Sequence, residues 1–318
     1  MLKSILLYTL IATLSNITTP TPVRIMQYNV EWLFIDYNNA SDCPGNGCTW
    51  KNQSEAQIHL DTISNNVQEL SPDIVHFCEV QGIDELQQVA NNLESNTYNP
   101  LFIQGKDTST GQNVGLLSKI QPTKNINRTE NRYNYPILGS KCGYTGVNGS
   151  SGVSKHLISE FTLLTYDTVL IGAHLLAFPT DPTRCAEREA QAMVLQEIII
   201  DALNKKKEVI VMGDFNDYDS EVLDSNSDIP KSIVLDILKM NGKLHSVAEW
   251  ISQQDRYSEW YDENGNCKST SNEFSMIDHI LVSPLLFSRI KQAFIYHGYT
   301  EECGTYQSDH YPVIVDFA

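Results

Sequence analysis

The chain has 318 residues, 41% of them hydrophobic, and a formal net charge of −17, because 39 Asp and Glu outnumber 22 Lys and Arg. This length allows one large domain or two small ones, and no linker-like, low-complexity or repeated segment favours two. The negative charge argues against a protein that simply coats nucleic acid. An enzyme could still hold phosphates through a few local cations and a bound metal ion.

The N-terminus has the features of a secretory signal peptide. Lys3 precedes a mostly apolar stretch, residues 4–14, which is followed by Ser15, a small residue suited to cleavage. This stretch is too short to span a bilayer, and no other segment is long and apolar enough to do so. We expect a signal peptide over residues 1–15, one domain over residues 23–318, and a secreted protein or one held in a secretory organelle. The alternative is a disordered or buried N-terminal segment.

Cysteines and glycosylation sequons fit the same route. The sequons, which predict a glycoprotein, start at Asn16, Asn52, Asn127 and Asn148. Cys78 lies in a strand-like run and is expected to be buried and free, while six other cysteines allow fifteen disulfide pairings. Of these pairings only Cys43–Cys48 is favoured, by the turn residues between them. A zinc site is the rival interpretation, but no paired CxxC is present.

Apolar periodicity predicts strands and helices in mixed order. Strands are expected at residues 23–30, 73–80, 114–118, 156–164, 168–175, 208–215, 276–283, 292–297 and 311–317, and helices at 55–70, 83–93, 187–203 and 232–240. An Asn-, Tyr- and Gly-rich stretch, 125–154, predicts a surface excursion near the site. Several strand pairs are joined by too few residues for a crossover helix. This favours an α/β sandwich of two sheets face to face, with helices outside, over a doubly wound parallel sheet.

Polar side chains gather where the apolar strands end. Five strands finish at or near such groups, and a sixth cluster precedes the last strand; they are Asn29 with Glu31, Glu79, His174, Asp214 with Asn216, Asp278, and Ser308-Asp309-His310. Because buried charge needs a partner, six such clusters on neighbouring strands indicate one convergent site. Their oxygen atoms are ligands preferred by hard cations, and His174 and His310 titrate near neutral pH. This combination predicts hydrolysis of a phosphate ester.

The same segments resemble, in order, the motifs of the endonuclease/exonuclease/phosphatase superfamily. They read Tyr28-Asn29-Val30-Glu31, Phe77-Cys78-Glu79-Val80, Gly172-Ala173-His174-Leu175, Gly213-Asp214-Phe215-Asn216, Ile277-Asp278-His279-Ile280 and Ser308-Asp309-His310-Tyr311-Pro312-Val313. The resemblance runs from about residue 23 to the C-terminus. It implies a catalytic domain with a four-layer α/β sandwich fold, whose two mixed, mostly antiparallel sheets carry helices outside.

The resemblance also implies a role for each site residue. Glu79, Asn29 and Asp309 would bind the divalent cation, with Glu31 as a further contact; the ion is expected to be Mg²⁺ or Mn²⁺, with Ca²⁺ as an accessory. Asp214 would orient or deprotonate the attacking water and Asn216 would hold the phosphate. His310, oriented by Asp278, would contact the phosphate. His174 is implied as general acid or phosphate ligand, and Asp107 is a guess for its carboxylate partner.

Some neighbouring residues carry a plainer interpretation. His279 and His76 are expected to be structural, because each faces away from its neighbouring motif residue on the strand. Glu31 could be a solvated loop carboxylate. Trp32-Leu33-Phe34 could belong to the core or form an apolar lip at the mouth of the site.

Among phosphodiesters, DNA or RNA is the favoured substrate, as for a deoxyribonuclease-like endonuclease. Candidate phosphate-binding cations are Arg128, Arg132, Lys141, Lys155, Arg184 and Arg188. The chain departs from the pancreatic type at Gln81-Gly82 and at Asp217-Tyr218-Asp219. The alternatives are a sphingomyelinase-type phospholipase C acting on sphingomyelin at a membrane surface, and a catalytically silent binding protein on the same fold. We expect a monomer.

Overall fold

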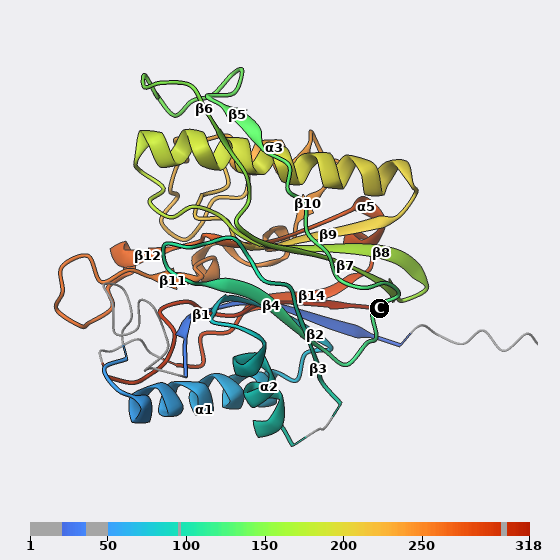
Figure 1. Cartoon of the computed structure of the whole chain (residues 1–318), viewed down its shortest axis with the longest axis vertical. Coiled ribbons are helices and arrows are strands. Elements are labelled where there is room, and N and C mark those ends of the chain that lie inside the picture. Colours follow the sequence, from blue (N-terminus) through green and yellow to red (C-terminus); the bar gives the residue numbers. More distant parts are fainter. Residues whose placement is uncertain (1–20, 36–49, 95–96, 300–303) are drawn as a thin grey trace, which may run out of the picture.

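A computed structural model describes residues 21–35, 50–94, 97–299 and 304–318 of the chain. Two β-sheets pack face to face near the middle of the molecule, and helices cover the outer side of each sheet (Figure 1). The predicted four-layer α/β sandwich is therefore confirmed. The predicted signal peptide and the favoured pair Cys43–Cys48 lie outside the described residues.

The first sheet has six strands and is antiparallel except for one pair. Its order is β14 (Ile290–Ile295), β15 (Val313–Phe317), β1 (Val23–Leu33), β2 (Ile74–Val80), β4 (Asn113–Ser118) and β3 (Asn99–Phe102). The parallel pair is β1 and β2, which are joined by helix α1 (Gln53–Leu70). Helix α2 (Ile83–Asn92) packs beside α1 on the same side of the sheet (Figure 1).

The second sheet has five strands and repeats this arrangement. Its order is β10 (His245–Ser246), β13 (Asp278–Val282), β9 (Glu208–Asp214), β8 (Tyr166–His174) and β7 (Lys155–Leu163). Here the parallel pair is β8 and β9, joined by the long helix α3 (Pro182–Asn204). Helix α4 (Val234–Lys239) packs against α3, and the short α5 (Pro284–Phe287) follows β13. Among the described residues, no helix meets the length and hydropathy that crossing a membrane requires.

Both crossover helices begin at a side-chain cap. The Asn52 side chain accepts a hydrogen bond from the Glu55 amide (3.0 Å), and the Asp181 side chain accepts one from the Arg184 amide (2.8 Å). Such caps satisfy amide groups that the first turn of a helix leaves free. Pro182, the first residue of α3, suits this position because it has no amide proton to satisfy.

Alternation along each strand divides the core into three layers. On β1, Met26, Tyr28 and Val30 pack toward α1 and α2, whereas Ile25 packs between the two sheets. A third cluster fills the space between the second sheet and α3 and α4. The polar residues of β1, Gln27 and Asn29, have the same parity as Ile25, so they face the other sheet.

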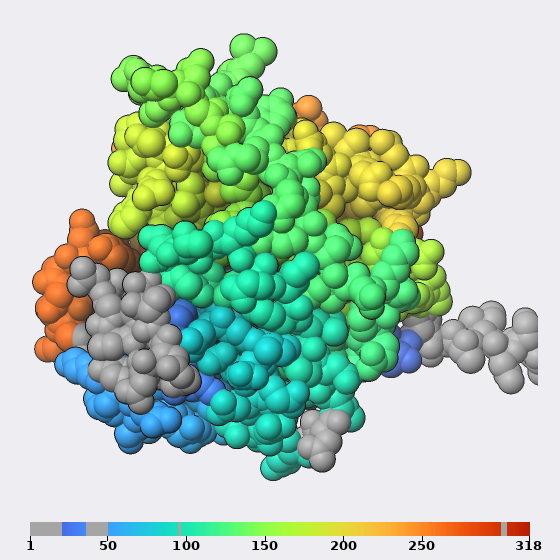
Figure 2. Space-filling model, in the orientation of Figure 1, coloured from blue at the N-terminus to red at the C-terminus, as the bar shows by residue number. Residues whose placement is uncertain are grey.

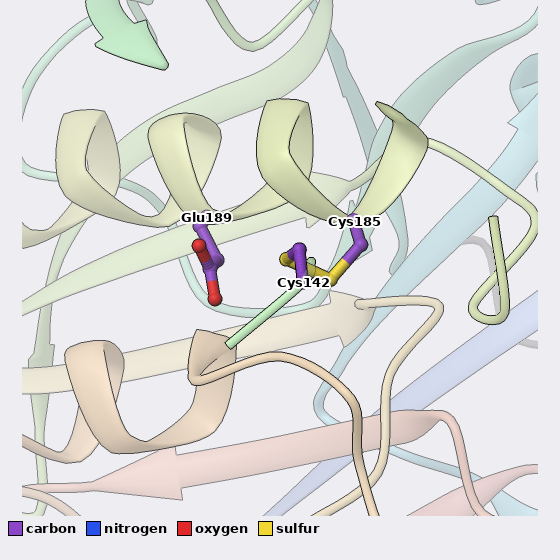
Figure 3. Close-up of side chains that lie close together, drawn as sticks. All are labelled: Cys142, Cys185 and Glu189. Atoms are coloured by element: carbon purple, nitrogen blue, oxygen red, sulfur yellow. A yellow bond between two sulfur atoms is a disulfide. The ribbon is translucent and has the colours of Figure 1, made fainter. Parts of the chain in front are cut away.

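The excursion at 125–154 lies on the surface, as predicted, and runs up to the top of the molecule in Figure 2. It contains a hairpin that the sequence did not predict, β5 (Tyr133–Tyr135) and β6 (Gly149–Ser151), which contacts α3. A disulfide between Cys142 and Cys185 ties the excursion to the first turns of α3, one turn before Glu189 (Figure 3).

Cys78 is buried and free, as predicted. A second unpredicted hairpin consists of β11 (Glu259–Trp260) and β12 (Phe274–Ser275).

Candidate active site

Three predicted site residues stand in a row across the second sheet. In the strand register His174 pairs with Asp214, and Asp214 pairs with Asp278. Paired residues on neighbouring strands point to the same face of a sheet, so the three side chains lie side by side. All three are almost fully buried. The Nε2 atom of His174 lies 3.5 Å from Asp214 Oδ2 and 3.9 Å from Glu79 Oε1.

His310 is held by Asp278 in a buried dyad. Its Nδ1 lies 2.6 Å from Asp278 Oδ2. Because a carboxylate oxygen accepts, Nδ1 carries the proton of this hydrogen bond, and Nε2 points away from Asp278. The other Asp278 oxygen accepts a hydrogen bond from the Gln27 amide (3.1 Å), and Gln27 in turn contacts His76 (2.5 Å). The predicted pairing of His310 with Asp278 is thus present in the structure, and His76 lies in the core as expected.

Gln27 is a functional neighbour that sequence reasoning missed. It is fully buried and precedes Asn29 by two residues, so both side chains project from the same face of β1. That spacing was the available signal. A buried glutamine two residues before a polar strand end indicates that the polar face continues inward.

Asn29 links Glu79 of the first sheet to Asp214 of the second sheet. Its Nδ2 donates to Asp214 Oδ2 (2.9 Å) and lies 3.3 Å from Glu79 Oε1. Glu79 Oε2 accepts a hydrogen bond from the Trp32 amide (3.2 Å). On the second sheet, the backbone N–H of Asn216 donates to Asp214 Oδ1 (2.8 Å). The side-chain Nδ2 of Asn216 donates to the Leu175 carbonyl (3.2 Å).

Four non-glycine residues around the site have left-handed backbone conformations. They are Glu31 (φ 47°), Trp32 (φ 54°), Glu79 (φ 65°) and Asn216 (φ 50°). At Glu79 the pairing register of β2 shifts, which marks a β-bulge and removes this side chain from strict alternation. Left-handed conformations cost non-glycine residues on the order of 1 kcal/mol or more and recur at functional sites.

The aromatic residues after the first motif belong to the core. Trp32 and Phe34 are buried in a small cluster with Trp50 and Ala56. They do not form an exposed lip at the mouth of the site. The Trp32 amide instead holds Glu79, so this segment positions a carboxylate that is predicted to bind the metal ion.

The buried charges shift one another's pKa values in opposite directions. Burial, and then the charge of Asp278, raise the pKa of Asp214 to about 8, against the opposing effect of His310. Burial lowers the pKa of His310, but its bond and charge interaction with Asp278, supported by Asp309 and Asp214, raise that pKa well above its usual value. Burial, followed by the charge of Lys155, lowers the pKa of His174 well below its usual value. At neutral pH His310 is therefore a cation and His174 is neutral.

Asp309, Glu31 and Glu79 form an acidic group that fits a hard cation. Burial and the charges of Glu31 and Glu79 raise the pKa of Asp309 well above its usual value, against the opposing effect of His310. Asp309 Oδ1 is buried with no hydrogen-bond partner, while its backbone amide donates to Glu31 Oε2 (3.1 Å). Asp309 Oδ1 lies 3.9 Å from His310 Nε2. A carboxylate oxygen without a hydrogen bond, beside other carboxylates, suits Mg²⁺ or Mn²⁺. Asp214, Asp278 and His310 also offer ligand atoms within 4.8 Å of one another.

Several candidate partners and phosphate-binding cations are engaged elsewhere. Asp107 does not partner His174, because its carboxylate bonds Thr110 (2.6 Å) and lies 3.6 Å from Lys155. Arg188 is fully buried and pairs with Asp217 (3.2 Å), so it cannot contact a phosphate. The remaining three arginines contact local protein groups. Arg128 donates to the carbonyl oxygens of Gln104 and Val153, Arg132 donates to Ser150, and Arg184 forms a 3.6 Å ion pair with Glu187. Lys155 pairs with His174 across β7 and β8 and so lies beside the site.

Glu259 is an acidic residue of this site that no motif predicted. It forms an isolated bridge with His310 and accepts a hydrogen bond from the Ser275 hydroxyl (2.6 Å). Burial raises its pKa, His310 opposes this rise, and Asp278 and Glu79 add to it. A carboxylate that interacts with His310, Asp278 and Glu79 lies among the predicted site residues. His279, in contrast, donates from Nε2 to the Asp217 carbonyl (2.8 Å) and is structural, as expected.

Gly213 fixes the approach of β9 to β8. A Cβ atom at this position would lie 1.7 Å from the Ala173 carbonyl oxygen. We expect Gly213→Ala to shift Asp214 and His174 together, and so to destabilise the fold by about 1–3 kcal/mol and to reduce activity. Thermal unfolding and phosphodiester turnover measure both effects.

The matched control is Gly242→Ala. Gly242 also has a left-handed backbone (φ 82°), but a Cβ there meets nothing within 4 Å. It tests backbone strain without the clash, at a cost of about 1 kcal/mol and with unchanged activity. Equal activity losses in the two variants would contradict the role of the clash.

A model of the endonuclease/exonuclease/phosphatase family matches residues 26–310. The chain belongs to this family. No curated protein matches the sequence. Among solved structures, a family member from Bacteroides vulgatus has a TM-score of 0.60 at 16% identity and covers 94% of this chain and 99% of its own.

Two further matches show how broadly the family fold is used. TDP2 from C. elegans has a TM-score of 0.55 at 14% identity, covering 93% of this chain and 75% of that one. A mannosyl-6-phosphatase from Bacteroides thetaiotaomicron has a TM-score of 0.55 at 17% identity, covering 92% of this chain and 98% of that one. At these identities the likeness shows the fold alone, and the family match implies a phosphoester substrate of unspecified kind.

Proposed function

We propose that this chain is a divalent-metal-dependent phosphodiesterase. The observation that carries the proposal is the meeting of the Asp278–His310 dyad with Asp214 and Asn29 in one buried group. A cationic imidazole, a carboxylate of raised pKa and a nearby set of oxygen ligands are the groups that hydrolysis of a phosphate ester needs.

Each residue has a place in this mechanism. Glu79 and Asp309, with Asn29 and Glu31, would hold Mg²⁺ or Mn²⁺, which supplies Lewis acidity toward a phosphate oxygen. His310 Nε2 donates a hydrogen bond to the phosphate and offsets its negative charge. Asp214 in its ionised form accepts a proton from the attacking water, and its raised pKa makes that form a stronger base than an exposed aspartate. Asn216 orients the phosphate beside Asp214.

His174 acts as a phosphate ligand in this proposal. The general-acid role also implied by the family motif requires a protonated imidazole near neutral pH. The lowered pKa of His174 supports the ligand role instead, with Nε2 facing Asp214 and Glu79.

The compartment and the substrate are further parts of the proposal. Secretion is supported by the Cys142–Cys185 disulfide and by the exposure of the sequon residues Asn52, Asn127 and Asn148. A nucleic-acid substrate, favoured by the sequence, loses one argument because Arg188 is buried and the other three candidate arginines contact protein groups. A sphingomyelinase-type activity is therefore the second candidate function. It is supported by the lining of a pocket next to the site.

Turnover of bis(4-nitrophenyl) phosphate tests the proposed function. We expect excess EDTA to abolish hydrolysis and added Mg²⁺ or Mn²⁺ to restore it, because no side chain at the site replaces the cation's Lewis acidity. The monoester 4-nitrophenyl phosphate serves as the comparison for a phosphomonoesterase. Full activity in the chelator would contradict the mechanism.

A further inference from the structure

A pocket of about 470 Å³ opens directly beside the catalytic residues. It lies between the loop after β8, the loop after β9 and the β11–β12 hairpin. Asn216 and Glu259, which belong to the candidate active site, also line this pocket. Its volume falls within the range of small-molecule sites. A group attached to a phosphate at Asn216 would therefore enter it.

The charged side chains that line this pocket are all acidic. Asp228, Glu259 and Glu263 line it, and none of its described lining residues is Lys, Arg or His. A fourth acid, Glu273, is engaged by Trp260 Nε1 (3.2 Å) and by the Thr270 hydroxyl (3.0 Å). A second phosphate of a polyanionic substrate would meet repulsion here, whereas a positive group would be attracted.

Aromatic rings complete the walls. Tyr218, Tyr261, Phe178 and Phe274 line the pocket, and Phe178 and Tyr261 remain 66% and 65% exposed in the free protein. The Tyr218 pKa is raised first by burial and then by the charges of Glu259 and Asp228, and both carboxylates line the same pocket as Tyr218. Aromatic faces beside carboxylates attract alkylated ammonium groups.

The wall formed by the loop after β8 is held in place from inside the protein. The buried Arg188 guanidinium donates to the carbonyl oxygens of Leu176 (3.1 Å), Phe178 (3.1 Å) and Pro179 (3.2 Å). Its charge is balanced by Asp217, which also accepts a bond from Ser232. Phe178 is thus presented by a preformed loop, and little ordering is required when a ligand binds.

We propose that this pocket binds the ammonium group of a cationic alcohol that is esterified to the scissile phosphate, as choline is in a phosphocholine diester. The proposal rests on the proposed function and names its substrate class. Asn216 and His310 hold the phosphate, and the ammonium group lies between the carboxylates and the rings. The same chemistry occurs in choline phospholipids and in soluble glycerophosphocholine.

Two nitrophenyl diesters of equal shape test the charge requirement. One is 4-nitrophenyl phosphorylcholine, and the other is its neutral 3,3-dimethylbutyl isostere, in which carbon replaces nitrogen. Both release nitrophenolate, so the chemical step is the same. We expect kcat/KM to be about tenfold higher for the choline ester, the size of a favourable cation–π and ionic contact.

The variants Tyr261→Ala and Glu263→Gln should lower this ratio, because both residues line the pocket and are exposed, so neither change threatens folding. Asp201→Asn is the matched control, since it removes one exposed acid far along α3, beside Lys205, and should leave the ratio unchanged. A wild-type ratio near one, or a ratio that the pocket variants leave intact, would overturn the proposal.

Calorimetric titration separates this proposal from the proposed function. Phosphocholine should bind more tightly than 3,3-dimethylbutyl phosphate whether or not turnover occurs, and Tyr261→Ala should remove the difference. Equal binding of the two would overturn the pocket assignment, even in an active phosphodiesterase. Sphingomyelin vesicles and glycerophosphocholine then identify the source, and hydrolysis of either supports the proposal. Preference for plasmid DNA over both contradicts it.

Discussion

His310→Ala should lower phosphodiester turnover on the order of 10²–10⁴-fold, the usual contribution of a positioned acid–base group. The imidazole is buried, bonded to Asp278 at 2.6 Å and cationic at neutral pH. Its loss removes the positive charge nearest the scissile phosphate in the proposed mechanism. The measurement is kcat on bis(4-nitrophenyl) phosphate at saturating Mg²⁺, with metal binding checked by the thermal shift that Mg²⁺ causes. Near-wild-type turnover would remove the site assignment.

Asp278→Asn is the companion variant, because it keeps the shape of the dyad and removes its charge. Asp278 is the main cause that raises the His310 pKa, while burial lowers it. Without this carboxylate the pKa of His310 should fall, so the imidazole loses its proton at a lower pH. If the protonated form is the active one, the alkaline limb of the pH–rate profile moves to lower pH in Asp278→Asn. An unmoved limb would show that His310 does not act as a cation.

Glu79→Gln should reduce activity at least about 100-fold and raise the Mg²⁺ concentration needed for half-maximal rate, because loss of a direct ligand exceeds the effect of losing an outer contact. Glu79 lies at a β-bulge, and its carboxylate is held by Asn29 and the Trp32 amide. The substitution keeps the size of the side chain and one of these two contacts while it removes the negative charge. The Mg²⁺ dependence of rate and of thermal unfolding is the measurement.

Glu197→Gln provides the control for this charge change. Glu197 is exposed on α3 and accepts a bond from Asn131 (3.0 Å), remote from the catalytic strands. It should leave both the rate and the Mg²⁺ dependence unchanged. An unaltered Mg²⁺ requirement in Glu79→Gln would place the cation elsewhere, with the group Asp214, Asp278 and His310 as the next candidate.

The site residues that the sequence predicted interrupt or adjoin the apolar pattern of a strand. A site residue outside such a pattern was not predicted. Asp214 and Asp278 each stand at one end of a strand, and strand pairing alone brings them together, while Asn29 interrupts the apolar run of β1. Glu259 was not predictable in this way, because it lies on a two-residue strand in a region without apolar alternation. The disulfide was equally open, since Cys142 and Cys185 lie 43 residues apart and six cysteines allow fifteen pairings.

Arg188 shows why residue type alone misled at one position. An arginine shortly after a catalytic histidine is a reasonable phosphate ligand in sequence. Its helix, however, turns this side chain inward to Asp217, a residue of the loop after β9. Helix phase relative to the sheet decides between the two outcomes. The apolar pattern of α3 is nearly uniform around the helix, and so it gave little information on phase.

The division of the site between the two sheets has a consequence for how the core influences catalysis. Asn29 and Glu79 come from the first sheet, and His174, Asp214 and Asp278 come from the second. The separation of these two halves is set by the side chains packed between the sheets, among them Cys78, Leu170 and Met212. These inter-sheet residues therefore act as spacers. A change in their volume, with every site residue left unsubstituted, would alter activity by shifting one half of the site relative to the other.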